Sequence, residues 1–208
     1  MGNKRETFLR TVINHIFGDT KCEFPKISQF ELEYAGLEEE VYRVYKLLGG
    51  TMEQIPINYK WDIKCPDFCL ELDEERHFNR YRALTLDSPI YWDYKWFSVQ
   101  NYKRYCSDKE ILCLKSASFG SYWKNNSTEK AFLESSEEGN LSDNGSSRWR
   151  QRAFYDFLKD INSIIRNKPV IRISIYDEYN DIPVNKMLYT EDYKTTKEYL
   201  LHILKDFV

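Results

Sequence analysis

Long apolar runs, glycine-rich phosphate loops and common nucleophile motifs are all missing from this sequence. No apolar segment approaches the roughly 20 residues that a membrane-spanning helix needs. The first ten residues, Met1–Arg10, lack the apolar stretch of a secretory signal. The eight glycines form no phosphate-binding loop, and there is no Gly-x-Ser-x-Gly elbow and no set of kinase motifs. We therefore expect no membrane association and a cytoplasmic location.

Cysteine is present in a pattern that does not suit a secreted protein. The five cysteines are an odd number without the spacing of a disulfide framework, so reduced thiols are expected. Cys65 with Cys69, and Cys106 with Cys113, could instead supply a four-thiolate zinc site in an interaction domain. Their spacings fit zinc knuckles poorly, and a free cysteine in an apolar run often packs as a small hydrophobic residue.

The charge balance disfavours a simple DNA-binding module. The net charge is −3 and the isoelectric point about 5.8, whereas a protein held on nucleic acid by bulk electrostatics should be basic. An enzyme is compatible with these values, because a metal site concentrates acidic groups. Hydrophobic residues are 42% of the chain and charged residues 30%, which predicts a folded chain with a real core.

Hydrophobic periodicity predicts helices on both sides of a group of strands. It gives helices over residues 7–17, 37–48, 148–166 and 190–208, strands over 59–64, 68–73, 110–115 and 170–176, and a loop over 135–147. We therefore expect the α/β class, with a mixed central β-sheet flanked by helices. One domain would span residues 1–208, with its core at about 1–78 and 148–208 and a long aromatic and basic insertion at about 79–147.

The chemistry is concentrated in one acidic hairpin. Alternation places Glu71 and Asp73 on the same face of one strand and Asp62 on its neighbour. If the hairpin closes through residues 64–67, Asp62 lies opposite Cys69 and diagonal to Glu71. Three converging carboxylates suit Mg²⁺ or Mn²⁺, and His77 could transfer a proton. The alternative is an amphipathic hairpin that merely exposes its charged face to water.

Asp62 together with the run Phe68–Phe78 resembles the very-short-patch-repair-like branch of the PD-(D/E)XK nuclease superfamily. In that branch an Asp on one strand precedes a Glu-x-Asp on the next, and a His follows. The resemblance implies a restriction-endonuclease-like fold and an endonuclease that hydrolyses DNA phosphodiester bonds with Mg²⁺ or Mn²⁺, in restriction, repair or defence. It implies Asp62, Glu71 and Asp73 as metal ligands and His77 as an auxiliary catalytic residue.

The sequence departs from that branch in places. Glu74 stands where the branch usually has Gly, and a long stretch separates the motif from the helix at residues 148–166. A literal use of the superfamily motif would instead take Asp62 and Lys64, and Lys64 is an electrostatic helper in either mapping. Asp67, in the Pro-Asp pair of the turn, is the alternative to Asp62 as first ligand.

Basic residues further along the chain are candidate DNA contacts. Lys103 and Arg104 lie in an aromatic segment, which is typical of phosphate binding and base stacking but also of a packing extension. Arg148, Arg150 and Arg152 open a helix, where cations oppose the macrodipole, so their position favours a phosphate partner. Arg152 could equally neutralise an active-site carboxylate.

Three further alternatives concern function and assembly. One is a non-catalytic domain that binds nucleic acid or protein on a nuclease-like fold. Another is a nucleophilic pair of Cys69 and His77, which nothing in the sequence orients. A nuclease that breaks both DNA strands often needs two active sites, which is compatible with a homodimer.

Overall fold

The computed structural model describes residues 4–18 and 22–207. The chain forms two compact units, and both are discontinuous in sequence. The first comprises residues 1–25, 60–73 and 168–208, and the second comprises 26–59 and 74–167. One of the points where the chain passes from one unit to the other lies between Asp73 and Glu74.

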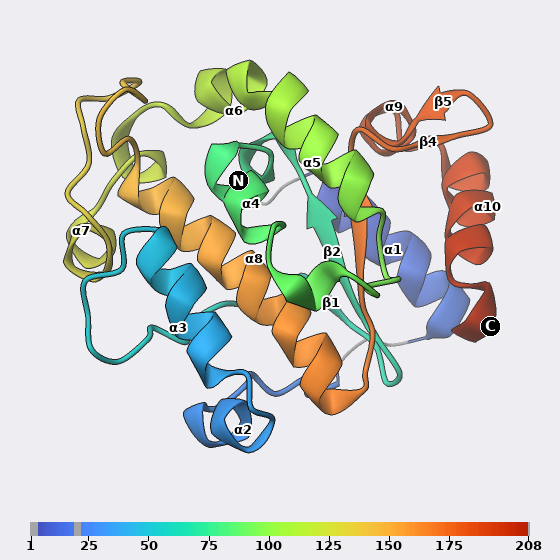
Figure 1. The fold of residues 1–208 in the computed structure, drawn as a ribbon. Coiled ribbons are helices and arrows are strands. Elements are labelled where there is room, and N and C mark those ends of the chain that lie inside the picture. The colour runs from blue at the N-terminus through green and yellow to red at the C-terminus, as the bar shows by residue number, and fades with distance from the viewer. Residues whose placement is uncertain (1–3, 19–21, 208) are drawn as a thin grey trace. The chain divides into compact units, whose positions relative to one another are not determined.

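The first unit contains a small mixed sheet in the order β1-β2-β3 (Figure 1). β1 (Ile63–Lys64) pairs antiparallel with β2 (Cys69–Asp73), and β2 pairs parallel with β3 (Val170–Ser174). Every residue of β2 and β3 is buried. β-branched residues dominate β3, as expected for a strand covered on both faces. The α/β class and the mixed sheet are therefore confirmed, although the sheet is small and most of the chain is helical.

Helices and a second, two-stranded sheet complete the first unit. α1 (Lys4–Phe17) packs against α9 (Val184–Tyr189) and α10 (Tyr193–Ile203). The remaining elements are β4 (Glu178–Tyr179), β5 (Ile182–Pro183) and the 3-10 helix η4 (Lys205–Phe207). The helix predicted to reach Val208 thus begins later and ends earlier, and Val208 itself lies outside the described residues.

The second unit is helical and is built around α8 (Ser147–Arg166), a 20-residue helix. A buried stripe on α8 contains Trp149, Ala153 and Phe157, as its periodicity predicts. Asn167 ends the helix in the left-handed conformation, at φ 47°. The other elements of this unit are α2 (Gln29–Tyr34), α3 (Glu38–Leu47), η1 (Glu75–His77), α4 (Arg80–Thr85), η2 (Pro89–Tyr91), α5 (Val99–Asp108), α6 (Glu110–Ala117), η3 (Gly120–Tyr122) and α7 (Asn126–Ala131).

One predicted strand is wrong. Residues 110–115 lie in α6, where Cys113 and Ala117 are buried one helical turn apart while Ile111 is 68% exposed. The strand was inferred from a short apolar run, and such a run cannot be told from a helix by periodicity alone. The strand predicted over residues 59–64 is also shorter than expected, because only Ile63–Lys64 pairs with β2.

Two other expectations concern irregular backbone and the membrane. Residues 135–146 form no helix or strand, as predicted, and α8 begins at Ser147, the last residue of the predicted loop. Among the helices that the structure describes, none combines the length and apolar character needed to cross a membrane.

Candidate functional site

The two acidic residues of β2 are buried in the sheet. Glu71 is 0% and Asp73 is 1% exposed, in a strand of which every residue is buried. Their side chains lie on the same face of β2, as strand alternation requires. The alternative in which the hairpin exposes its acidic face to water therefore does not hold for these two residues.

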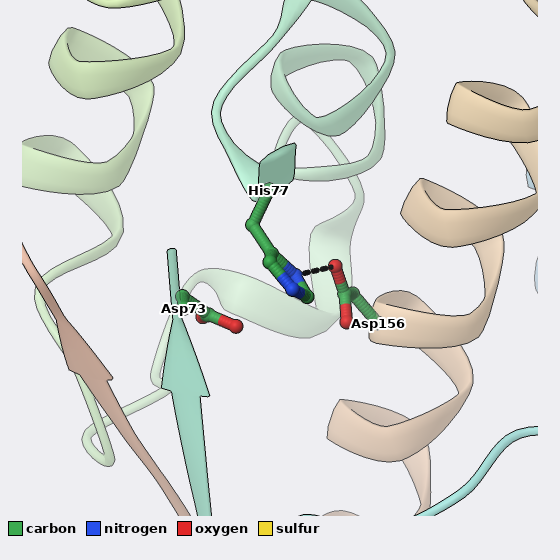
Figure 2. Close-up of side chains that lie close together, drawn as sticks. All are labelled: Asp73, His77 and Asp156. Carbon is green, nitrogen blue, oxygen red and sulfur yellow. Dashed lines mark hydrogen bonds and ion pairs between the residues drawn. The ribbon is translucent and has the colours of Figure 1, made fainter. Parts of the chain in front are cut away.

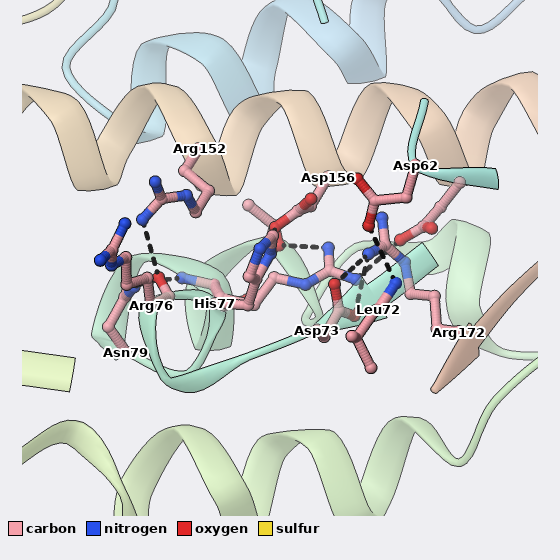
Figure 3. A network of polar contacts seen from close by, with 12 residues as sticks. Asp62, Leu72, Asp73, Arg76, His77, Asn79, Arg152, Asp156 and Arg172 are labelled. Carbon is pink, nitrogen blue, oxygen red and sulfur yellow. Dashed lines mark hydrogen bonds and ion pairs between the residues drawn. The ribbon is translucent and has the colours of Figure 1, made fainter. Parts of the chain in front are cut away.

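Asp62 joins the sheet beside Glu71 instead of opposite Cys69. The observed register pairs Lys64 with Cys69 and Ile63 with Leu70, so the predicted alignment was wrong by two residues. The N–H of Asp62 donates to Oε1 of Glu71 at 3.1 Å. Oδ2 of Asp62 in turn accepts a hydrogen bond of 3.0 Å from the N–H of Leu72 (Figure 3). These two bonds hold Asp62 and Glu71 together.

The other residues predicted in the hairpin lie apart from this contact. Lys64 is half-buried in β1, two residues beyond Asp62. Asp67 is exposed in the turn between β1 and β2, as expected for a turn residue. Asp62 is therefore better placed than Asp67 to act with Glu71.

Asp73 is held by an arginine from the neighbouring strand. Arg172 of β3 donates from Nη1 to both carboxylate oxygens of Asp73, at 2.9 Å each (Figure 3). The two side chains are 0% and 1% exposed. Parallel pairing places Arg172 opposite Glu71, and Asp73 lies two residues further along β2. This ion pair compensates a buried carboxylate and fixes its orientation.

A histidine–carboxylate pair follows in the second unit (Figure 2). Nδ1 of His77, on η1, lies 2.8 Å from Oδ2 of Asp156, on α8. The side chain of Asp156 is 3% exposed and that of His77 is 20% exposed. A carboxylate at Nδ1 orients the ring and favours the tautomer with a proton on that nitrogen. In that arrangement Nε2 is the nitrogen able to exchange a proton or bind a cation.

Arginines lie on the same helix and on η1. Arg148 and Arg152 are one turn apart on α8, and Nη1 of Arg152 donates to the carbonyl oxygen of Arg76 at 3.4 Å (Figure 3). The pKa of Arg152 is lowered to about 10, mainly by burial and also by the charges of Arg148 and Arg76, against the opposing charge of Asp156. Burial also lowers the pKa of Arg148. The guanidinium groups are therefore in a cationic environment.

Arg150, another predicted DNA contact, instead makes contacts within its own unit. Arg150 is buried, donates to the carbonyl oxygens of Leu48 and Asn144 at 2.9 and 3.0 Å, and lies over the ring of Tyr81. It therefore joins segments of its own unit.

Lys103 and Arg104 lie on the surface of α5. Lys103 forms an exposed ion pair of 2.6 Å with Asp87, and Arg104 is exposed above the ring of Tyr105. Among the described residues, neither Lys103 nor Arg104 contacts His77 or Asp156.

Comparison with known proteins places the chain in a family. Residues 43–190 match the group described as "Family of unknown function (DUF7255)". The chain belongs to this family. No curated protein and no solved structure gives a significant match. The matched range runs from α3 to α9, so the family region includes all the carboxylates, arginines and the histidine described above.

The cysteines within the family region behave as packed thiols. Burial raises the pKa of Cys65 and Cys113 to about 12. The thiol of Cys69 donates to the carbonyl oxygen of Ile63 at 3.2 Å. Among the described residues, no cysteine belongs to a set of three or more side chains close enough to share a metal ion. The zinc alternative therefore gains no support.

Sequence analysis missed Asp156 and Arg76 as candidate site residues. Asp156 lies next to Phe157 and three residues after Ala153, at the edge of the apolar stripe of α8. A carboxylate beside a buried stripe is a visible but weak sign of a buried acid. Arg76 is hidden in the charged run Asp73–His77, where nothing in the sequence distinguishes it from a surface residue.

Proposed function

We propose that the chain is a divalent-cation-dependent nuclease that hydrolyses phosphodiester bonds in DNA. The observation that carries this proposal is the complete burial of Glu71 and Asp73 on one face of β2. Transfer of a carboxylate out of water is costly, so buried acids are retained where they are paired or where they bind cations. Neighbouring buried acids of this kind are also typical of functional sites.

Each unit offers side chains that suit a hard divalent cation. In the first unit Asp73 offers a carboxylate oxygen, and in the second unit His77 and Asp156 offer an imidazole nitrogen and a carboxylate oxygen. Asp62 and Glu71 are the further carboxylates that the resemblance implies. Carboxylate oxygens suit Mg²⁺ and Mn²⁺, and an imidazole ligand is better tolerated by Mn²⁺ than by Mg²⁺. When bound, such a cation supplies charge stabilisation at the phosphate and acidifies a coordinated water.

The protein's own groups have separate parts in this proposal. Asp156 orients the ring of His77, so that Nε2 would accept or return a proton where carboxylates alone hold the cation. Arg172 fixes the carboxylate of Asp73 in one orientation. The N–H of Leu72 holds Asp62 beside Glu71. Preorganised groups of this kind reduce the rearrangement needed when substrate binds.

The proposal also includes a restriction-endonuclease-like fold. In chain order the strands β1 and β2 are followed by α8, β3 and α10, and the resemblance implies the same succession of a helix, a strand and a closing helix after the acidic strands. We therefore infer a restriction-endonuclease-like core with a reduced sheet. A role in restriction, repair or defence is a family-level analogy.

The test is a cleavage assay on plasmid, linear and single-stranded DNA with Mg²⁺ or Mn²⁺. The native chain is compared with Glu71→Gln, Asp73→Asn, His77→Gln and Asp156→Asn. Asp67→Asn is the matched control, because it removes an exposed carboxylate from the same hairpin. Loss of cutting by a hundredfold or more in the first set, with the control unchanged and all variants folded by circular dichroism, supports the proposal.

A binding measurement separates an enzyme from a binding domain. Titration with Mn²⁺, followed by calorimetry, should show a site that Asp73→Asn and Asp156→Asn weaken. If the native chain binds DNA but neither binds Mn²⁺ nor cuts any substrate of the panel, the nuclease hypothesis is wrong and the non-catalytic alternative holds.

A further inference from the structure

Three arginines of the second unit gather where η1, η3 and α8 meet. η1 and η3 both contact α8. Arg76 comes from η1, and Arg148 and Arg152 come from successive turns of α8. The donation from Arg152 to the carbonyl oxygen of Arg76 ties the helix to η1 (Figure 3). All three side chains are half-buried, so they are partly desolvated yet accessible.

These arginines lack the partners that usually neutralise them. Among the residues that the structure describes, none of the three forms an ion pair with a carboxylate. Arg148 instead donates to the neutral amide of Gln151. By contrast, Arg80 and Arg82 of the same unit are each paired with an acid, at 2.8 Å. The charge of Asp156 acts on Arg152, but three like charges held together at partial burial still repel one another and favour a bound anion.

Aromatic rings lie beside the arginines. The guanidinium of Arg76 lies over the ring of Tyr122, with Cζ 3.8 Å from its centroid. Tyr122 is 37% exposed and touches Phe119, which is 51% exposed, at a centroid distance of 5.8 Å. Exposed rings next to guanidinium groups are typical of places where a base stacks while its phosphate is bound.

We propose that Arg76, Arg148 and Arg152 bind a phosphomonoester, the terminal phosphate of a nucleic-acid strand or of a nucleotide. Guanidinium groups match the oxygens of phosphate in geometry. A monoester carries close to two negative charges at neutral pH, whereas an internal diester carries one, so three cations match the monoester better. The choice of substrate class rests on the proposed nuclease function, but the binding requires neither a cation nor cleavage.

The test compares three labelled oligonucleotides of one sequence by fluorescence anisotropy, with EDTA present to prevent cleavage. They carry a 5′-phosphate, a 3′-phosphate or hydroxyl groups at both ends. The native chain should bind one phosphorylated strand at least about tenfold more tightly than the hydroxyl strand. Competition by a nucleoside monophosphate and by inorganic phosphate then shows whether a free nucleotide is bound as well.

The variants are Arg76→Gln, Arg148→Gln and Arg152→Gln, and Arg43→Gln is the control. Arg43 is a half-exposed arginine of the same unit whose side chain is 52% exposed and paired with Glu40. Each of the first three should abolish the preference for a phosphorylated end, measured as the ratio of the affinities for the phosphorylated and the hydroxyl strand, and the control should retain that ratio. Equal binding of all strands by the native chain overturns the proposal. So does a preference that survives in the three folded variants.

If the phosphate preference is present but no DNA is cut with any cation, the proposed nuclease function fails while this site stands. If DNA is cut but phosphorylated and hydroxyl strands bind equally, the nuclease stands and this site fails.

Discussion

Two arginines of α4 allow a matched test of how burial changes the contribution of an ion pair to the free energy of unfolding. Arg82 donates from Nη2 to Oδ2 of Asp160 at 2.8 Å, and the side chains are 2% and 0% exposed. Tyr91 adds a bond of 2.6 Å to the same oxygen. Two residues earlier, Arg80 pairs with Glu110 at the same distance, but its side chain is 47% exposed. The helix, the residue type and the distance are thus shared, and exposure differs.

Substitution of Arg82 by Met should destabilise the second unit by about 3–5 kcal/mol, because Asp160 would be left charged in a site without water. The same change at Arg80 should cost about 1 kcal/mol or less, since water and salt screen an exposed pair. The double variant Arg82→Met/Asp160→Leu should recover most of the loss, because both buried charges are then absent. A loss of this size is a large fraction of the 5–15 kcal/mol that typically stabilises a domain.

Urea unfolding followed by tryptophan fluorescence measures these differences. Four of the five tryptophans, at positions 92, 96, 123 and 149, lie in the second unit and report on it. The reasoning is refuted if Arg82→Met costs no more than Arg80→Met. It is also refuted if the losses of Arg82→Met and Asp160→Leu simply add in the double variant.

Two other predictions follow from the titration of single groups. Burial opposes ionisation of Glu110, but hydrogen bonds from Arg80 outweigh it and leave the pKa of Glu110 below its ordinary value. The stability that this pair contributes is therefore present at neutral pH and is lost as the pH falls through the lowered pKa of Glu110. Urea unfolding of Glu110→Gln should accordingly show a shallower acid dependence than that of the native chain. Burial raises the pKa of Cys65 and Cys113 to about 12, and Cys22 is the cysteine that is not buried. Iodoacetamide at pH 8 should therefore label Cys22 first, as mass spectrometry of peptides can show, and rapid labelling of Cys113 in the folded chain would contradict its burial.

Helices with a clear apolar repeat could be predicted from this sequence, whereas α5 and the shorter helices could not. α1, α3 and α8 have apolar residues repeating at helical spacing over ten residues or more. α4 and α7 are six residues each, too short to be stable outside the packed unit. Their N-caps, Asn79 and Asn125, are visible in the sequence. A cap without a periodic segment behind it does not distinguish a helix from a turn.

The hairpin could be located from sequence, but its register could not. Period-two alternation identifies β2. Glu71 and Asp73 in this strand, and His77 shortly after it, stand out by their chemistry. The register depends on how many residues the turn contains, and a tight closure through residues 64–67 was assumed. The observed pairing of Lys64 with Cys69 leaves four residues between them, which brings Asp62 beside Glu71.

Partners distant in sequence were beyond prediction for a different reason. Asp156 is 79 residues from His77, and Arg172 is 99 residues from Asp73. Contacts of this separation are decided by the packing of whole elements, and local periodicity carries no information about that packing. Sequence alone therefore identified the acids and the histidine but not the groups that hold them in place.

The two buried arginine–aspartate pairs carry different weight for function. A buried ion pair is weak evidence of stabilisation, since apolar residues of similar volume often serve as well. Arg82 and Asp160 lie within the helical unit and bond to Thr85 and Tyr91, so holding helices together accounts for them. Asp73 ends a strand, shares its face with the buried Glu71, and is followed four residues later by a histidine already oriented by an acid. Packing accounts for none of those neighbours, and this is why the proposed function uses the carboxylates of β2 while Asp160 is assigned a structural role.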